Sequence, residues 1–99
     1  MSQKPDEDGL HGFLALCSSL HSHEELRPFF DLFFTIEEKE TIASRFLIVK
    51  ALLEQKLTQR EISDACKVSI AQITRGSNAL KIIDPGVKEY LLNHLGISV

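Results

Sequence analysis

The 99-residue chain contains no tryptophan, one tyrosine and only two cysteines. No apolar run approaches the roughly 20 residues of a membrane-spanning helix, so we expect no membrane association. The first nine residues, MSQKPDEDG, have neither the basic start nor the apolar stretch of a signal peptide, and we expect a disordered tail over residues 1–9 of a cytoplasmic protein. The cysteines, Cys17 and Cys66, both lie in helix-like apolar patterns. Reduced core thiols are expected, although the sequence leaves a single disulfide open.

The chain also lacks the side-chain arrangements of an enzyme or a metal site. His21 and His23 are two positions apart, so they project from different sides of a helix, and no acidic residue is placed to complete a zinc site. Neither cysteine stands in a nucleophile motif. We therefore expect no enzymatic activity and no metal cofactor.

Positive charge is scarce overall but concentrated in one segment. Residues 56–81 hold five Lys or Arg and two Asp or Glu, a local charge of +3, whereas the rest of the chain holds six and twelve, a local charge of −6. The total is −3. A net negative charge argues weakly against nucleic-acid binding, but a basic segment is the electrostatic pattern of such a contact.

No segment alternates apolar and polar residues as a half-buried strand does, and helical spacing is found throughout. The sequence predicts an all-α fold of six short helices. The first covers 10–21, the second contains RPFFDLFF, and the third is long and ends near residue 55 or 56. The fourth covers 59–66, the fifth opens at Ile70, and the sixth begins after Asp84-Pro85 and stops at Gly96. Capping boxes of the form S/T-x-x-E/Q begin at Ser22, Thr35, Thr58 and Ser69.

The stretch RPFFDLFF is apolar nearly all round a helix and needs cover on every side. A chain of this size buries little surface alone, so we expect an intertwined homodimer. Its single helical domain, 10–99, would divide into a dimerisation core, 10–57 with 83–99, and a head, 58–82. The alternative is a compact monomer with a few exposed phenylalanines.

The head has the layout of a DNA-binding helix-turn-helix: a helix over 59–66, a connection over 67–69 and a second helix from residue 70. Lys67 stands where such turns often have a left-handed glycine, at a cost of about 1–2 kcal/mol. The alternative is an ordinary helical hairpin with a solvated polar face. We expect the inside of the angle to be filled by Ile62, Cys66, Val68 and Ile73, and the outward side to carry Ser69, Ala71, Gln72 and Arg75.

The segments FTIEEKETIASRFLIVKALLEQK and LTQREISDACKVSIAQITRGSNALK closely resemble the tryptophan (trp) repressor family over residues 34–81. The resemblance implies intertwined all-helical homodimers that bind operator DNA with L-tryptophan, or an indole analogue, as co-repressor. It implies that much base readout runs through water. By motif position, the DNA-binding residues would be Gln59, Arg60, Ser63, Lys67, Ser69, Ile70, Ala71, Gln72, Thr74 and Lys81.

The same resemblance implies a ligand site. Arg45 and Arg75 would flank the indole ring, Arg75 would meet the carboxylate, and Gly76 would allow close approach. Backbone carbonyls near Leu32 and Phe34, with Thr35, would close the pocket from the other subunit. Ala79 stands where the family usually has a serine that helps hold the amino group, Lys39 replaces a usual arginine, and Ser63 replaces a usual lysine.

Two of these residues also need an explanation by themselves. Arg45 lies on the flank of an apolar stripe, where a guanidinium suits an aromatic face; a salt bridge to Glu38 is the alternative. Gly76 costs about 1 kcal/mol relative to alanine inside a helix. Either a ligand approaches it or the helix ends there, and the first is favoured because Leu80 stays in phase with Ile73. The competing functions are a helix-turn-helix protein without a tryptophan switch and a purely structural dimerisation module.

Overall fold

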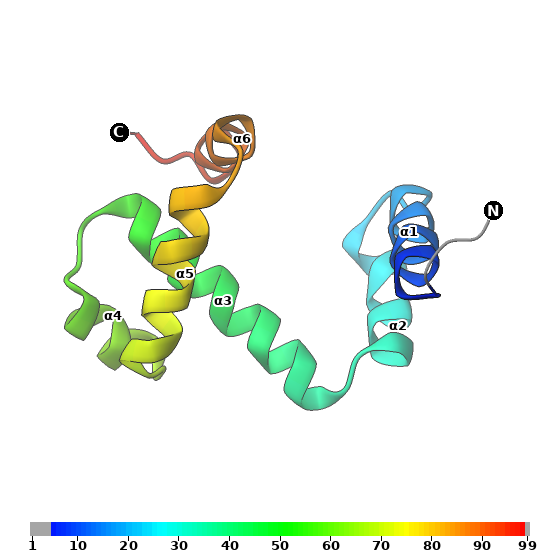
Figure 1. The fold of residues 1–99 in the computed structure, drawn as a ribbon, viewed down its shortest axis with the longest axis horizontal. Coiled ribbons are helices and arrows are strands. Elements are labelled where there is room, and N and C mark those ends of the chain that lie inside the picture. Colours follow the sequence, from blue (N-terminus) through cyan, green and yellow to red (C-terminus); the bar gives the residue numbers. More distant parts are fainter. Residues whose placement is uncertain (1–4, 99) are drawn as a thin grey trace. The chain divides into compact units, whose positions relative to one another are not determined.

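The computed structural model describes residues 5–98, which contain six α-helices and no strand, as the sequence predicted for an all-α fold (Figure 1). Their contacts divide the chain into two compact units, one up to Glu37 and one from Glu38 on. The helices are α1 (Pro5–Ser18), α2 (His23–Phe33), α3 (Ile36–Glu54), α4 (Gln59–Cys66), α5 (Ile70–Ile82) and α6 (Pro85–Leu95).

Helix α1 differs from the prediction at both ends. It begins at Pro5, so residues 5–9 of the expected tail are helical, while residues 1–4 lie outside the described residues. A proline in the first turn followed by acidic residues is a favourable helix start, and the sequence reading passed over it. The helix ends at Ser18 rather than near residue 21. There the Ser18 and Ser19 hydroxyls donate to the carbonyls of Leu14 and Leu16, at 2.9 and 2.7 Å.

An aromatic cluster joins α1 to the end of α2. The ring of Phe13 lies 6.1 Å from that of Phe30 and 5.6 Å from those of Phe33 and Phe34, the last two in edge-on geometry. The cluster is nevertheless poorly covered, since 53% of Phe33 is exposed. Between residues 7 and 37 every side chain is at least partly exposed.

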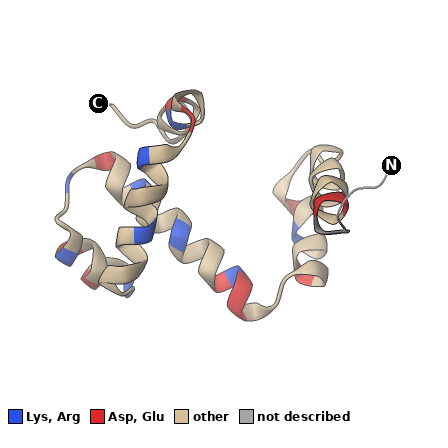
Figure 2. Ribbon diagram, in the orientation of Figure 1, with Lys and Arg blue, Asp and Glu red and all other residues tan. Residues whose placement is uncertain are grey.

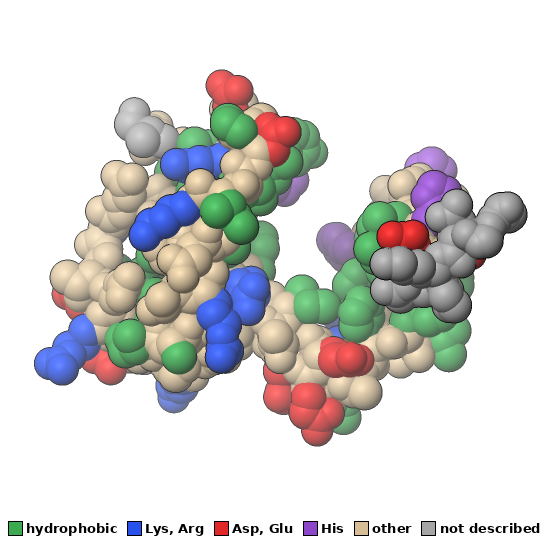
Figure 3. Space-filling model, viewed as in Figure 1, with side chains coloured by type: hydrophobic (Ala, Val, Ile, Leu, Met, Phe, Trp, Pro, Cys, Tyr) green, Lys and Arg blue, Asp and Glu red, His purple; other side chains and the backbone are tan. Residues whose placement is uncertain are grey.

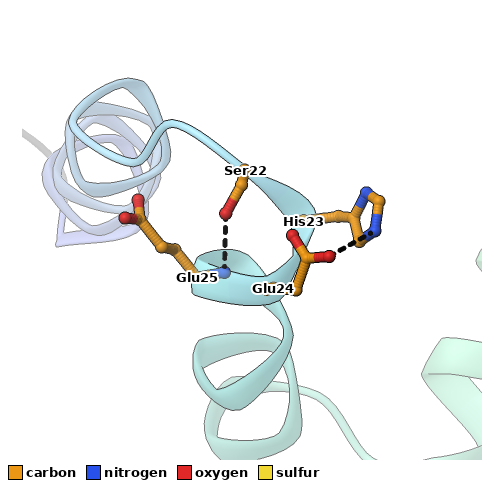
Figure 4. A network of polar contacts seen from close by, with 4 residues as sticks. All are labelled: Ser22, His23, Glu24 and Glu25. Atoms are coloured by element: carbon orange, nitrogen blue, oxygen red, sulfur yellow. Dashed lines mark hydrogen bonds and ion pairs between the residues drawn. The ribbon is translucent and has the colours of Figure 1, made fainter.

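The start of α2 is capped as predicted, with one difference (Figure 4). The Ser22 hydroxyl accepts a hydrogen bond from the Glu25 N–H at 3.2 Å. The Glu25 carboxylate accepts from the N–H of His21 at 2.7 Å rather than from that of Ser22, so the reciprocal half of the box is displaced by one residue. His23 and Glu24 form an exposed ion pair beside it, at 3.3 Å.

The second unit has a small aliphatic core at the crossing of three helices. Ile48 of α3, Ile62 of α4 and Ile73 of α5 are each at most 1% exposed. Four partly buried side chains pack around them: Ala51, Leu52, Cys66 and Val68. Helix α3 ends at Glu54, and the next residue, Gln55, has φ 58°, in the left-handed region.

Helical spacing places Ile42, Phe46, Val49 and Leu53 in one apolar stripe along α3, and only part of this stripe is buried. Ile42 and Phe46 remain 45% and 49% exposed, whereas Ile48, which lies off that stripe, is buried. Helix α6 is similar: Asp84 caps it and Gly96 ends it with φ 70°, as predicted, but Val87 and Tyr90 are 46% and 69% exposed. Large apolar areas of both helices are therefore not covered by the unit from Glu38 on.

Candidate nucleic-acid interface

Helices α4 and α5 each begin with a complete capping box. At α4 the Thr58 hydroxyl accepts from the Glu61 N–H at 3.1 Å, and the Glu61 carboxylate accepts from the Thr58 N–H at 2.8 Å. At α5 the Ser69 hydroxyl accepts from the Gln72 N–H at 3.2 Å, and the Gln72 carbonyl oxygen accepts from the Ser69 N–H at 2.9 Å. Both predicted boxes are confirmed, and they fix where each helix starts.

The connection between the helices is a tight, internally bonded turn. Lys67 has φ 58° and ψ 48°, the left-handed conformation predicted for the residue at this position. The Ser63 carbonyl accepts from the N–H groups of Lys67 and Val68. The Ser63 hydroxyl donates to the Val68 carbonyl at 2.6 Å, so this side chain closes the turn from the opposite direction. The half-buried Ser63 thus has a structural task besides any contact with DNA.

The inside of the angle is filled as predicted. Ile62 and Ile73 are both 0% exposed, with Cys66 and Val68 packed against them. The sequence reading missed Ile48, which joins this cluster from α3. The three isoleucines attach the helix-turn-helix to the long helix α3.

The outward side of α4 and α5 is mostly open, and Lys and Arg side chains are spread over it (Figures 2 and 3). Two of the residues predicted to contact DNA are half-buried, Ser63 and Gln72, and each makes a local hydrogen bond. The others are exposed: Gln59, Arg60, Lys67, Ser69, Ile70, Ala71, Thr74 and Lys81.

Helix α5 runs without a break through Gly76, so the alternative in which the helix ends there is wrong. The glycine is buried, and a Cβ built on it would lie 2.9 Å from Cγ2 of Ile48 and 3.7 Å from Cδ1 of Leu52. The glycine therefore allows a close approach of α3, which the sequence analysis did not consider. The partner, Ile48, lies two helices earlier in the chain.

The residues expected around a ligand fall in both units. Arg45, Arg75 and Ala79 are exposed on α3 and α5 of the second unit. Leu32, Phe34 and Thr35 belong to the first unit; Leu32 is 72% exposed, Thr35 is exposed and Phe34 is half-buried.

Other predicted features can be located in the part of the chain that the structure describes. Cys17 and Cys66 are free, half-buried thiols. No group of three or more His, Cys, Asp or Glu side chains is placed to hold a metal ion among residues 5–98. None of the helices in that range has the length and apolar character to cross a bilayer.

Comparison with known proteins places these features in a family. The family model described as "Trp repressor protein" matches residues 8–95. A Trp operon repressor homolog of Chlamydia caviae is 58% identical over 93 residues, 94% of this chain and 92% of that protein. One from Chlamydia trachomatis serovar D is 52% identical over 86 residues, 87% and 92% of the two chains. One from Haemophilus influenzae strain PittEE is 31% identical over 87 residues, 88% and 86%. The chain belongs to the Trp repressor family.

Proposed function

We propose that this protein is a tryptophan-dependent transcriptional repressor that binds operator DNA as a homodimer through α4 and α5. The observation that carries the proposal is the helix-turn-helix itself, with both capping boxes complete and the turn in left-handed geometry, in a chain of the Trp repressor family. The relatives from Chlamydia caviae and Chlamydia trachomatis are named Trp operon repressor homologs, and repressors regulate transcription and are not enzymes. A bacterial repressor would act in the cytoplasm, where the DNA is.

The DNA contact rests on the exposed face of the head. The first turn of α5 presents the small side chains of Ser69 and Ala71, which leave room for the helix to approach base edges in a major groove. Arg60 and Lys67 are exposed at the first turn of α4 and in the turn, where they can neutralise phosphates. Gln72 and Ser69 bond to each other within the cap, so base readout through bridging water suits this face better than direct contact by these two side chains.

The ligand contact rests on Arg45 and Arg75, exposed on α3 and α5 of the same unit. A guanidinium group stacks on an aromatic face and also pairs with a carboxylate, which are the two features of an amino acid with an indole ring. We assign Arg75 to the carboxylate and both arginines to the faces of the ring. Leu32, Phe34 and Thr35 of a second copy are the proposed remainder of the pocket.

The homodimer is supported by the amount of apolar surface that one chain leaves uncovered. Large apolar side chains are exposed on α1, α2, α3 and α6, and the unit up to Glu37 contains no fully buried residue among 7–37. An aliphatic or aromatic side chain gains about 1.5–3 kcal/mol on full burial, so a second copy that covers several of them stabilises the pair strongly.

The proposed function predicts DNA binding that depends on both tryptophan and salt. A duplex selected from a random pool with the wild-type protein and L-tryptophan would serve as the probe, in fluorescence anisotropy titrations with and without tryptophan. We expect tighter binding with tryptophan, weakening as salt increases. Arg60→Ala should weaken binding, whereas the matched control Lys88→Ala, on α6 outside the head, should not. DNA binding that is indifferent to tryptophan would contradict the proposal.

A second candidate is a helix-turn-helix regulator without a tryptophan switch. The observation in its favour is the contact between Gly76 and Ile48, which accounts for the glycine without any ligand. It predicts DNA binding in the absence of tryptophan and the same affinity in its presence. The two candidates therefore separate in the titration above.

Ala79 gives the proposal a finer test of ligand choice. It is exposed and has no hydroxyl to hold an amino group. We expect indole acids that lack the amino group to bind nearly as well as tryptophan, and Ala79→Ser to widen the difference by about 1 kcal/mol. Competition calorimetry with indole-3-propionate measures it, and a large preference for tryptophan in the wild-type protein would contradict the idea.

A further inference from the structure

Helix α5 passes so close to α3 at Gly76 that there is no room for a Cβ atom at this position. A Cβ on Gly76 would lie 2.9 Å from Cγ2 and 3.9 Å from Cβ of Ile48, and 3.7 Å from Cδ1 of Leu52. Carbon atoms in ordinary contact are about 3.5–4.0 Å apart. Only the Cγ2 distance is too short, so a single methyl group on α3 determines which residue α5 can carry at this position.

That methyl group has little freedom to move. Cγ2 is bonded directly to Cβ, so it changes place only if χ1 rotates or if the backbone of α3 shifts. A β-branched residue in a helix has one strongly preferred χ1 rotamer. Ile48 is also only 1% exposed and belongs to one closely packed cluster with Ile62 and Ile73, where a change of rotamer is costly. An added Cβ would therefore push α5 and α3 apart rather than rotate the side chain of Ile48.

We propose that Gly76 and Ile48 form a positioning contact that determines where α5, the helix proposed to enter the DNA groove, packs on α3. The inference rests on the proposed function and deepens it. If α5 binds in a DNA groove, its position on α3 determines whether the N-cap Ser69 and the α5 residues Ala71 and Thr74 reach the DNA. A shift of roughly half an ångström or more at Gly76 would move that face. In this account α3 requires the glycine even in the absence of a bound ligand.

The chain offers variants that isolate the single methyl group. Gly76→Ala adds the Cβ. Ile48→Leu removes the branch methyl with no loss of carbon atoms, whereas Ile48→Val keeps Cγ2 and removes only the Cδ1 carbon. Gly12→Ala is the control for a methyl group added to a helical glycine, since nothing lies within 4 Å of a Cβ built there.

The experiment measures the unfolding midpoint, L-tryptophan affinity by calorimetry, and affinity for the selected duplex at saturating tryptophan, at a temperature where circular dichroism shows every variant to be folded. We expect Gly76→Ala to lower the midpoint and to weaken DNA binding about ten-fold. Adding Ile48→Leu should restore both, and adding Ile48→Val should restore neither. Gly12→Ala and the single Ile48→Val variant, which keeps Cγ2, should bind DNA within about three-fold of wild type.

Two results would overturn the proposal. One is that Ile48→Leu and Ile48→Val have the same effect on the Gly76→Ala protein. The other is a Gly76→Ala protein with an unchanged midpoint that has lost only tryptophan affinity, which would return the glycine to the ligand site. Should the wild-type protein bind neither tryptophan nor DNA, the proposed function fails. The midpoints alone would then decide the contact: only Ile48→Leu raises that of Gly76→Ala if the proposal holds.

Discussion

The two units of this chain differ in charge and in how each is held together. Up to Glu37 there are two basic and seven acidic side chains, a net charge of −5; from Glu38 on there are nine and seven, a net charge of +2. The first unit relies on a partly exposed aromatic cluster around Phe13. The second has Ile48, Ile62 and Ile73 buried almost completely.

This difference separates two kinds of task. The basic unit builds its own core where α3, α4 and α5 cross, so it can hold a DNA-reading face in a fixed geometry. The acidic unit presents apolar side chains that its own helices leave open, as expected of a region completed by a second copy. Four predictions test this division, in order of decreasing effect.

The largest effect is expected in the isoleucine core. Ile73→Ala removes a 0% exposed side chain at the meeting point of three helices, so the free energy of unfolding should fall by about 2–5 kcal/mol. Urea unfolding followed by circular dichroism measures the loss. The same substitution at the 86% exposed Ile82 is the control. Equal effects at the two positions would show that the second unit has no core of its own.

The second prediction, with a smaller expected effect, tests whether a second copy buries the apolar side chains of the unit up to Glu37. Phe33 is 53% exposed in one chain, so in a monomer Phe33→Ala would remove a half-exposed ring together with its ring contact to Phe13, a loss of about 1 kcal/mol. In the homodimer we expect a loss of about 3 kcal/mol and a visible shift toward monomer in sedimentation experiments. A wild-type unfolding midpoint that does not change with protein concentration would contradict the dimer.

The capping box of α4 should contribute about 1 kcal/mol. Thr58→Ala removes the hydroxyl that accepts from the Glu61 N–H, while Thr58→Ser, which keeps a hydroxyl at the same position, serves for comparison. We expect the urea midpoint of Thr58→Ala to fall and its DNA affinity to fall with it, because the first turn of α4 carries Arg60. Unchanged stability would mean that packing alone fixes the start of α4.

The turn should give the smallest change, with opposite signs for two properties. Lys67→Gly relieves left-handed strain at φ 58° and should raise the free energy of unfolding by up to about 1 kcal/mol. If Lys67 also meets a phosphate, the variant should bind DNA more weakly, with a salt slope reduced by about one. A variant both more stable and equally tight in DNA binding would assign Lys67 to the turn only.

Patterns of a few adjacent residues predicted much of the fold, but they did not predict contacts between residues far apart in the sequence. The capping boxes at Thr58 and Ser69 and the left-handed Lys67 follow from a few adjacent residues, and each was predicted. The start of α1 at Pro5 was also local, but the acidic composition around it favoured a tail. Gly76 was recognised as unusual, yet its partner Ile48 lies in another helix, and single-sequence periodicity does not align two helices.

The site was predicted unevenly for the same reason. The interior residues Ile62 and Ile73 are fixed by helical spacing within the head, and the structure buries both. The arginines were named from a resemblance, because an exposed guanidinium has no distinctive pattern of its own; Arg45 and Arg75 are both exposed here. The groups proposed to meet these arginines belong to a ligand and to a second copy, and the spacing of residues within one chain does not encode either.

The most direct test of the central proposal is a calorimetric titration of L-tryptophan into the wild-type protein and into Arg75→Ala, with Lys88→Ala as the exposed-cation control. We expect one tryptophan bound per chain in the wild-type protein and in the control, and a loss of binding in Arg75→Ala. The absence of binding in the wild-type protein, or equal binding in all three proteins, would contradict a tryptophan-dependent repressor in which Arg75 holds the ligand.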